Sequence, residues 1–261
     1  MEFLLYLVLG AAAGVLAGLF GVGGGIIIVP VLMFSFTAQG IDPLVLTHLA
    51  VGTSLATIVF TSINSVLEHH RKGAVLWPVF MWMTVGILAG AVLGSLTAAS
   101  INGPMLQNII GVFAIVIALQ MGLDLKPKAS RDVPSQWGLT AAGGVIGWAS
   151  AIFGIGGGTL TVPFLTWRSV VMQKAVATSA ACGLPIAAVS ALSFMIIGWQ
   201  QPGLPEWSVG FVYLPAMVGI AITSMMFARF GARLAHALPP RLLKRLFALL
   251  LLGVGLQFLF G

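Results

Sequence analysis

The sequence predicts an all-α protein that crosses a membrane several times and consists of two repeats of opposite orientation. Composition, an internal duplication and the placement of charged residues together predict this class. Hydrophobic residues make up 59% of the 261 positions, and Asp, Glu, Lys and Arg together only 7%. Soluble domains carry roughly 25% charged residues. Twelve Lys and Arg with six Asp and Glu cannot cover a soluble surface, so soluble enzyme classes are excluded.

Apolar runs divide the chain into about 8 to 10 membrane segments. A spanning helix needs roughly 20 apolar residues, and most runs are long enough. Two are too short, and each follows a glycine cluster. Backbone that breaks its helix within a bilayer must be buried in protein or line a wet cavity, so the two short runs point to a site. The runs lie near 3–20, 25–37 (short), 44–67, 75–97, 105–123, 137–153, 159–167 (short), 170–198, 208–228 and 242–260.

The first apolar run is expected to remain in the mature protein. Residues 1–18 are apolar, but Glu2 stands where a secretory signal peptide carries Lys or Arg. A single cysteine, Cys182, excludes an internal disulfide framework.

A thirteen-residue stretch occurs twice in the chain. Residues 18–30 align with residues 151–163 at an offset of 133, and seven of the thirteen pairs are identical. Both copies contain Phe-Gly-x-Gly-Gly-Gly and end in Val-Pro. Shorter matches follow in the same order, 50–54 with 175–179 at an offset of 125 and 85–87 with 218–220 at an offset of 133. The sequence therefore predicts a first repeat over 1–125, a cytoplasmic linker over 126–134 and a second repeat over 135–261.

The placement of the cations predicts that the repeats are inverted. If each glycine cluster lies within a single span, the 12 Lys and Arg divide 5 to 7 between the two sides of the membrane. If the chain turns back at each cluster, all 12 lie on one side, and Glu2, Asp42 and Glu206 lie on the other. Only the second arrangement satisfies the positive-inside rule. We therefore expect a multi-pass membrane protein with both termini outside and the basic loops cytoplasmic.

Each repeat is expected to hold one glycine-broken hairpin and three long transmembrane helices. The hairpin tips are predicted at 21–25 and 154–158. The short run after the first tip rises about 20 Å as a helix, which is less than the roughly 30 Å thickness of the hydrocarbon core. The hairpins are therefore expected to be re-entrant.

The two tips predict a binding site for an anion. Inverted hairpins bring such tips together near the midplane of many secondary transporters, and here the helix that leaves each tip has its N-terminus there. A helix N-terminus carries roughly +0.5 charge and unpaired N–H groups, so two converging ends can hold an anion without a cationic side chain. The expected binding residues are Gly23, Gly24, Gly25, Ile26, Gly156, Gly157, Gly158 and Thr159.

Two alternatives apply to these residues. Glycines also let membrane helices pack closely, but the duplicated motif, followed each time by a short helix, favours a site. The repeated hydroxyl pairs Thr53–Ser54 and Thr178–Ser179 are expected where the next long helices begin, and they could donate hydrogen bonds to an oxyanion. Such residues also bond to carbonyls of their own helix, and the sequence leaves both roles open.

Several chemistries find little support in the sequence. No Asp, Glu, Lys or Arg lies well inside a predicted span, and intramembrane carboxylates usually mark proton relays. No cluster of His, Asp and Glu suits a metal. We expect no cofactor, no catalytic residues and no nucleic-acid partner, since the net charge of +6 is accounted for by basic loops that set orientation.

The glycine motif carries a resemblance to a known family. Residues 20–30 and their echo at 153–163, together with 50–54 and the stretch 69–77, resemble the TauE/SafE sulfite-exporter family. The resemblance covers nearly the whole chain. It implies a bacterial-type inner-membrane carrier of small sulfur oxyanions, such as sulfite, thiosulfate or organosulfonates.

The expected activity is export or uniport of such an anion. Moving one charge through 100 mV is worth about 2.3 kcal/mol, and a negative interior favours the outward movement of an anion without a coupling ion. Other activities stay open: an anion channel on the same scaffold, an ion-coupled importer of a small organic anion, or a non-transporting membrane subunit. The oligomeric state is open as well.

Overall fold

The computed structural model describes residues 2–20, 25–123, 132–237 and 240–260 of the chain. Within these ranges it contains ten helices and one two-stranded hairpin. Most helices begin and end close to the limits of the apolar runs, because backbone in a bilayer must pair its own N–H and C=O groups. The helices are α1 (Glu2–Phe20), α2 (Gly25–Ala38), α3 (Pro43–Arg71), α4 (Trp77–Ser100), α5 (Gly103–Gly122), α6 (Gln136–Phe153), α7 (Gly158–Trp167), α8 (Met172–Ile197), α9 (Leu214–Ala237) and α10 (Pro240–Phe260).

The run predicted from residue 208 differs from the expectation. It begins as an antiparallel hairpin of β1 (Ser208–Val209) and β2 (Val212–Tyr213), and α9 starts only after it. Gly210 adopts a φ of 55°, which a glycine in a tight turn tolerates without strain. The turn at Gly210 and Phe211 therefore replaces the first helical turns that hydrophobicity alone predicted.

The helices are those of a multi-pass membrane protein. In the described part of the chain, α3, α4, α5 and α8 are long and apolar enough to span a membrane. Shorter apolar stretches lie in α1, α2, α9 and α10. Large apolar side chains also remain on the outside of the bundle, such as Val145 and Leu249, which are 67% and 65% exposed. Such a surface suits contact with lipid.

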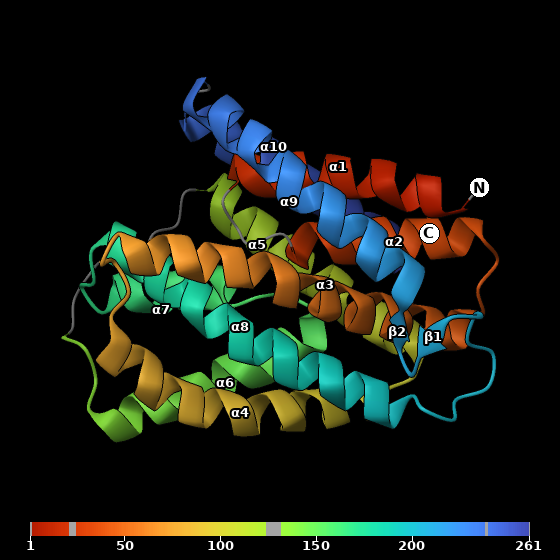
Figure 1. Ribbon diagram of the computed structural model, residues 1–261, viewed down its shortest axis with the longest axis horizontal. Coiled ribbons are helices and arrows are strands. Elements are labelled where there is room, and N and C mark those ends of the chain that lie inside the picture. Colours follow the sequence, from red (N-terminus) through yellow and green to blue (C-terminus); the bar gives the residue numbers. More distant parts are fainter. Residues whose placement is uncertain (1, 21–24, 124–131, 238–239, 261) are drawn as a thin grey trace.

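The long axis of the molecule has two chemically different ends. Figure 1 shows the start of α1, the end of α10 and the β1–β2 hairpin at one end, and the end of α3 with the start of α4 at the other. We call the first the Asp42 end, because α3 begins there with Asp42 as its N-cap. We call the second the basic end, because Arg71, Lys72, Arg168 and Lys174 lie at the helix ends gathered there.

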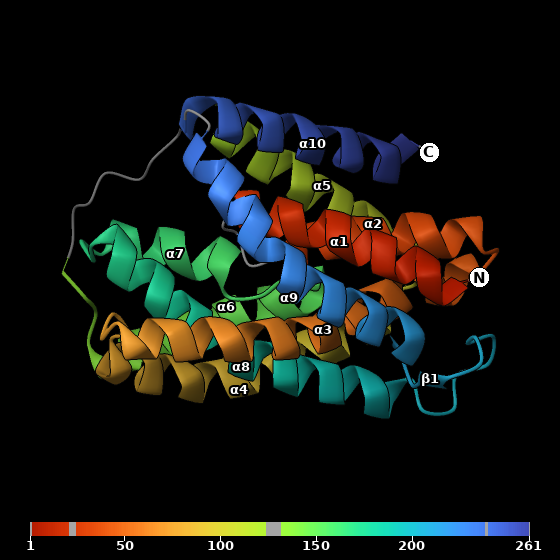
Figure 2. The same cartoon turned by 45° about the horizontal axis from the view of Figure 1, so that its top comes forward.

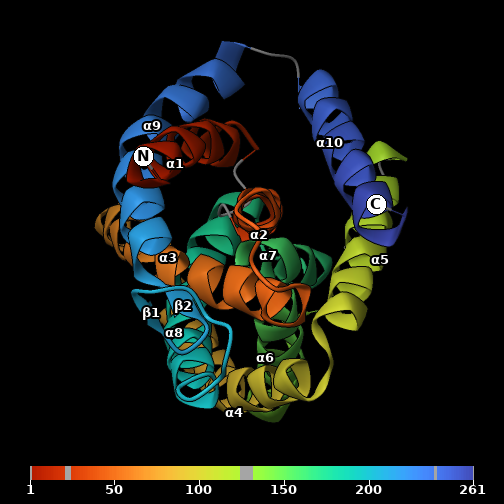
Figure 3. The same ribbon diagram turned by 90° about the vertical axis from the view of Figure 1, so that its right-hand side faces the viewer.

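The helices associate in pairs. The most extensive packing joins α1 to α9 and α4 to α6, followed by α5 with α10 and α3 with α8. Figure 2 shows α5 beside α10 along one edge of the molecule. Figure 3, viewed down the long axis, shows the short helices α2 and α7 in the middle of the bundle. The two glycine-preceded helices are therefore enclosed by the other elements.

Small residues allow the closest of these contacts. A Cβ added to Gly90 of α4 would overlap the backbone carbonyl of Gly144 in α6, and one added to Gly10 of α1 would overlap Thr223 of α9. Glycine at such positions lets two helix backbones approach in a membrane. The α4–α6 and α1–α9 pairs are thus each held at backbone contact.

The second glycine cluster ends one helix and starts another. Gly154 closes α6 in the left-handed conformation, with φ 64° and ψ 29°, and its N–H donates to the carbonyl of Ser150. Glycine adopts this conformation at little cost. The chain then passes through Ile155 and Gly156 to Gly157, the N-cap of α7. The predicted tip at 154–158 is therefore a break between two helices.

Candidate functional site

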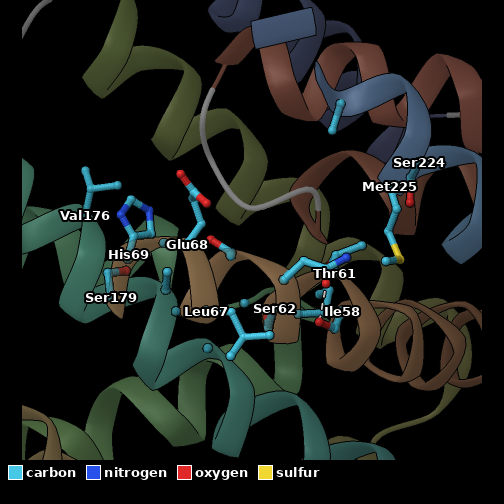
Figure 4. Close-up of a pocket in the computed structure, with 18 of the residues that line it drawn as sticks. Ile58, Thr61, Ser62, Leu67, Glu68, His69, Val176, Ser179, Ser224 and Met225 are labelled. Carbon is cyan, nitrogen blue, oxygen red and sulfur yellow. Dashed lines mark hydrogen bonds between the residues drawn. The ribbon is translucent and has the colours of Figure 1, made fainter. Parts of the chain in front are cut away.

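A cavity of about 690 Å³ lies between the second glycine cluster and the basic end. It follows α3 from Ile58 to Arg71, a rise of about 20 Å. Figure 4 shows the α3 residues of its wall between Val176 and Ser179 of α8 on one side and Ser224 and Met225 of α9 on the other. The cavity joins elements from both halves of the chain.

The inner wall of the cavity contains the N-terminus of α7. Gly156, Gly157 and Gly158 all line it, and α7 then runs for ten residues. Within the described residues, no side chain caps the first N–H groups of this helix. A helix N-terminus with free N–H groups attracts anions, so this wall has the polarity of an anion site.

Gly157 packs directly on the backbone of α8. A Cβ at this position would lie 2.7 Å from the carbonyl oxygen of Ser179 and 2.9 Å from the amide nitrogen of Gly183. Any other residue would force the start of α7 away from α8. The close approach also brings the side chain of Ser179 beside the helix N-terminus.

The hydroxyl of Ser179 is buried in this wall without a bond. Ser179 is 1% exposed, and among the described residues its Oγ has no hydrogen-bond partner. Leaving a buried polar group unpaired costs about 1–3 kcal/mol. The structure therefore leaves Ser179 Oγ near the start of α7 without a hydrogen bond to any described residue.

The wall contributed by α3 is polar over more than one helical turn. Thr61, Ser62, Asn64 and Ser65 all line the cavity, on a helix that is otherwise apolar over most of its length. None of these four residues was among the predicted ligands. Their spacing of one, three and four residues, which places them along one side of a helix, was the signal that could have found them.

Charged groups gather where the cavity reaches the basic end. Glu68, His69 and Arg71 line this part, and Glu68 forms a 2.9 Å ion pair with Lys72. Among the cavity-lining residues that the structure describes, Arg71 is the one Lys or Arg. Among the described residues, the wall at the second glycine cluster therefore carries no Lys or Arg side chain.

Three of the four predicted hydroxyl ligands are engaged elsewhere. Ser54 Oγ donates to the carbonyl of Gly154 over 2.9 Å, so it holds the end of α6. Thr53 and Thr178 accept from the backbone N–H groups of Tyr213 and Leu76. Of the two pairs, only Ser179 lies on the cavity wall with a hydroxyl that is unbonded among the described residues.

The expected position of these pairs was wrong. Thr53 lies ten residues after the start of α3, and Thr178 six residues after the start of α8. Both helices begin earlier, at Pro43 and Met172, close to the starts of the apolar runs. The two pairs consequently lie inside the protein, where Thr53, Ser54 and Thr178 bond to neighbouring backbone.

The first glycine cluster is described only in part. Gly23 and Gly24, predicted as ligands, lie outside the described residues. Gly25 and Ile26 are buried at the start of α2. A Cβ at Gly25 would lie 2.8 Å from the Cα of Ile155, so the start of α2 touches the second cluster. Thr159 is 9% exposed, and its hydroxyl has no partner within the described part of the chain.

The described residues contain no group of three or more His, Cys, Asp or Glu side chains that could hold a metal ion.

A model of the sulfite exporter TauE/SafE family matches residues 6–258. The chain belongs to the TauE/SafE family. It is a membrane transporter and not an enzyme, as this family and the relatives below are named for transport.

Curated relatives of the TauE/SafE chain match nearly its whole length. A probable membrane transporter protein of Haemophilus influenzae is 38% identical over 97% of each chain. One from Methanocaldococcus jannaschii is 28% identical over 98% of this chain and 96% of its own. Another from Bacillus subtilis is 28% identical over 100% and 98%. No solved structure shows a significant match to the chain.

Proposed function

We propose that this TauE/SafE protein is a secondary transporter of small sulfur-containing oxyanions, such as sulfite, thiosulfate or organosulfonates. The observation that carries the proposal is the position of Ser179. Its hydroxyl is buried, has no partner among the described residues, and lines the same cavity as the N-terminus of α7. Membership of the sulfite-exporter family indicates a sulfur-containing substrate, and the donors on the cavity wall favour an anion.

The polarity of this wall fits an oxyanion. Sulfur oxyanions expose several acceptor oxygens, and hydrogen bonds to a charged acceptor are about twice as strong as neutral ones. The hydroxyl of Ser179 and the N–H groups that follow Gly157 provide donors on one side of the cavity. We assign Gly156, Gly157, Gly158 and Ser179 to the substrate.

The predicted ligands outside this wall are assigned different roles in the proposal. Gly23 and Gly24 remain proposed ligands, because Gly25 of the same cluster touches Ile155 at the second tip. Ile26 and Thr159 are kept as residues next to the binding site, since each directly follows a glycine cluster in the chain. Thr53, Ser54 and Thr178 are assigned to the scaffold instead, since each already forms a hydrogen bond to backbone.

Helix packing supports the two inverted repeats, 1–125 and 135–261. If α1 to α5 correspond to α6 to α10, the pair α1–α9 becomes α6–α4, and the pairs α3–α8 and α5–α10 map onto themselves. These are the most extensive contacts in the molecule. Direction agrees as well, because α3 runs from the Asp42 end to the basic end and α8 runs the opposite way (Figure 1).

In the proposed orientation the basic end faces the cytoplasm of a bacterial-type inner membrane, and both termini face outside. Arg71, Lys72, Arg168 and Lys174 lie at the basic end, as the positive-inside rule requires. The cavity then reaches the cytoplasmic side. A membrane potential of 100 mV, negative inside, favours the exit of each negative charge by about 2.3 kcal/mol, so export needs no coupling ion.

Reconstituted flux tests the proposal. Purified protein in liposomes is offered sulfite, thiosulfate, sulfoacetate, taurine and chloride, and saturable movement of a sulfur oxyanion is expected. The S179A variant should raise the KM for that anion by about tenfold or more, because a hydrogen bond to a charged group contributes about 1.5–3 kcal/mol and each 1.4 kcal/mol is about a factor of ten.

The matched control for S179A is S193A on the same helix. The hydroxyl of Ser193 bonds to the carbonyl of Val189, and Ser193 is not a cavity-lining residue, so S193A should keep the parental KM. Flux of none of the sulfur oxyanions, or an unchanged KM in S179A, contradicts the proposal. Strict dependence on a Na⁺ or proton gradient contradicts uniport.

A further inference from the structure

The cavity reaches the basic end, while the corresponding region towards the Asp42 end is packed shut. We infer that the outer half of the transport path lies between α4 and α8, that it is closed in this structure, and that the hydroxyl of Ser190 lines it when it opens. The inference rests on the proposed transport function. It assigns a path and a residue to the step that releases the anion outside.

The internal repeat locates the counterpart of the cavity. The offset of 125 that relates residues 50–54 to 175–179 takes the cavity-lining Ser65 of α3 to Ser190 of α8. The offset of 133 that relates 85–87 to 218–220 takes the cavity-lining Ala228 of α9 to Ser95 of α4. The wall between α3 and α9 therefore corresponds to the interface between α8 and α4.

This interface is closed in the structure. Ser190 and Ser95 are both 0% exposed, as are Ile186 and Ala91, one turn before them on the same helices. The packing of α4 along α8 is more extensive than that of α9 along α3. A cavity therefore separates part of α9 from α3, whereas the corresponding helices α4 and α8 pack against each other.

The residues along α8 identify the face that meets α4. Cys182 and Ile186 belong to one apolar cluster with Met83 and Ile87 of α4. Ser190 lies four residues after Ile186, which places it on the same face one turn further towards the Asp42 end. Ser190 thus continues the row of Cys182 and Ile186 along α8, at the depth where a path to the outside must begin.

The hydroxyl of Ser190 in this interface is buried without a bond. Ser190 Oγ has no hydrogen-bond partner among the described residues, and Ser190 is 0% exposed. Burial of an unpaired polar group costs about 1–3 kcal/mol, and native proteins leave few of them. Hydration of Ser190 in an open outer path removes this cost.

The packing of the helices suggests what moves. Gly86, Gly90 and Gly94 of α4 touch the backbone of α6 so closely that a Cβ at any of them would overlap it. A pair held at backbone contact moves as one body. Separation of the α4–α6 pair from α8 opens the outer path, and the α1–α9 pair closes on α3 in the same way.

Cysteine accessibility tests the outer path. Cys182 is the single native cysteine, so S190C is made in a C182A background and reconstituted in liposomes. A membrane-impermeant cationic thiol reagent is added outside vesicles whose protein faces right side out. Labelling of S190C should be slow without substrate and at least about tenfold faster while the sulfur oxyanion moves outward, because the open state is then more populated.

Q201C in the same background is the matched control. Gln201 lies just after α8 at the Asp42 end and is exposed. The charged reagent should label it at a rate that substrate does not change. Modified S190C should no longer transport, whereas Q201C treated with the reagent should transport normally.

Two results separate this inference from the proposed function. S190C that transports the anion but is never labelled from outside, or is labelled at a rate independent of substrate, refutes the outer path between α4 and α8. Folded native protein that moves no sulfur oxyanion refutes the proposed function instead.

Discussion

The backbone N–H of Tyr213 donates a 2.9 Å hydrogen bond to Oγ1 of Thr53, which lies 160 residues earlier in the chain. Leu76 donates in the same way to Oγ1 of Thr178 over 3.0 Å. Tyr213 is the last residue before α9, and Leu76 is the last before α4. Each threonine therefore fixes the segment that leads into a helix of the other half of the chain.

Replacement of Thr53 by Val should destabilise the protein. The variant removes the acceptor of the 2.9 Å bond from the buried N–H of Tyr213, and loss of a buried hydrogen bond costs about 1–3 kcal/mol, so T53V should unfold at a lower temperature in detergent. T53S keeps the hydroxyl and should unfold close to the parental temperature. A T53V protein of parental stability that has lost anion transport would instead show that Thr53 binds the substrate.

The two repeat-related serines should respond differently to alanine. S54A removes the 2.9 Å bond to the carbonyl of Gly154 and should lower the free energy of unfolding by about 0.5–1.5 kcal/mol. S179A removes a hydroxyl that has no partner within the described residues, so it should keep parental stability without substrate. Denaturation of both variants in detergent measures this difference, and equal losses of stability would contradict it.

Substitution of Gly157 should abolish the site. A Cβ there would lie 2.7 Å from the carbonyl oxygen of Ser179, so G157A must displace the start of α7. We expect flux to fall to background, and the substrate anion should no longer raise the unfolding temperature, since stabilisation by a ligand requires binding to the folded state. G253A is the control, because a Cβ at Gly253 meets no described atom within 4 Å. Parental flux in G157A would disprove the assignment.

Single cysteines on the exposed connections should report the orientation. Q201C lies after α8 at the Asp42 end, Q173C lies in the first turn of α8 at the basic end, and both native residues are exposed. An impermeant thiol reagent added to intact cells should label Q201C and should label Q173C only after the membrane is permeabilised. Native Cys182 is 0% exposed and should contribute little background. The reverse pattern would invert the proposed topology.

Several features followed from residue order alone. Ten apolar runs predicted the positions of the helices, because an uninterrupted apolar segment in a bilayer has no other way to pair its backbone. The glycine cluster at Phe153–Gly158 predicted a break between two helices, and Gly154 ends α6 there with a positive φ. Local chemistry decides such features, so the sequence carries them directly.

The roles of the repeated hydroxyls could not be read in the same way. Thr53, Ser54, Thr178 and Ser179 form two equivalent pairs in the sequence. The fold brings backbone partners from distant segments to the first three. It leaves Ser179 beside Gly157 on the cavity wall. Which hydroxyl is free depends on the groups across the helix interface, and these are far away in the chain.

The sequence by itself determined that the chain is a membrane-embedded helical protein of the TauE/SafE family, since composition, apolar run length and the glycine motif are properties of the chain. Only the tertiary structure decided that the cavity lies between α3, α8 and α9 and reaches the basic end, while α4 lies against α8. Two halves with similar sequences can pack equally tightly or unequally. The distances between helices decide which end of the molecule the cavity reaches in this conformation. The order of residues alone does not show which end that is.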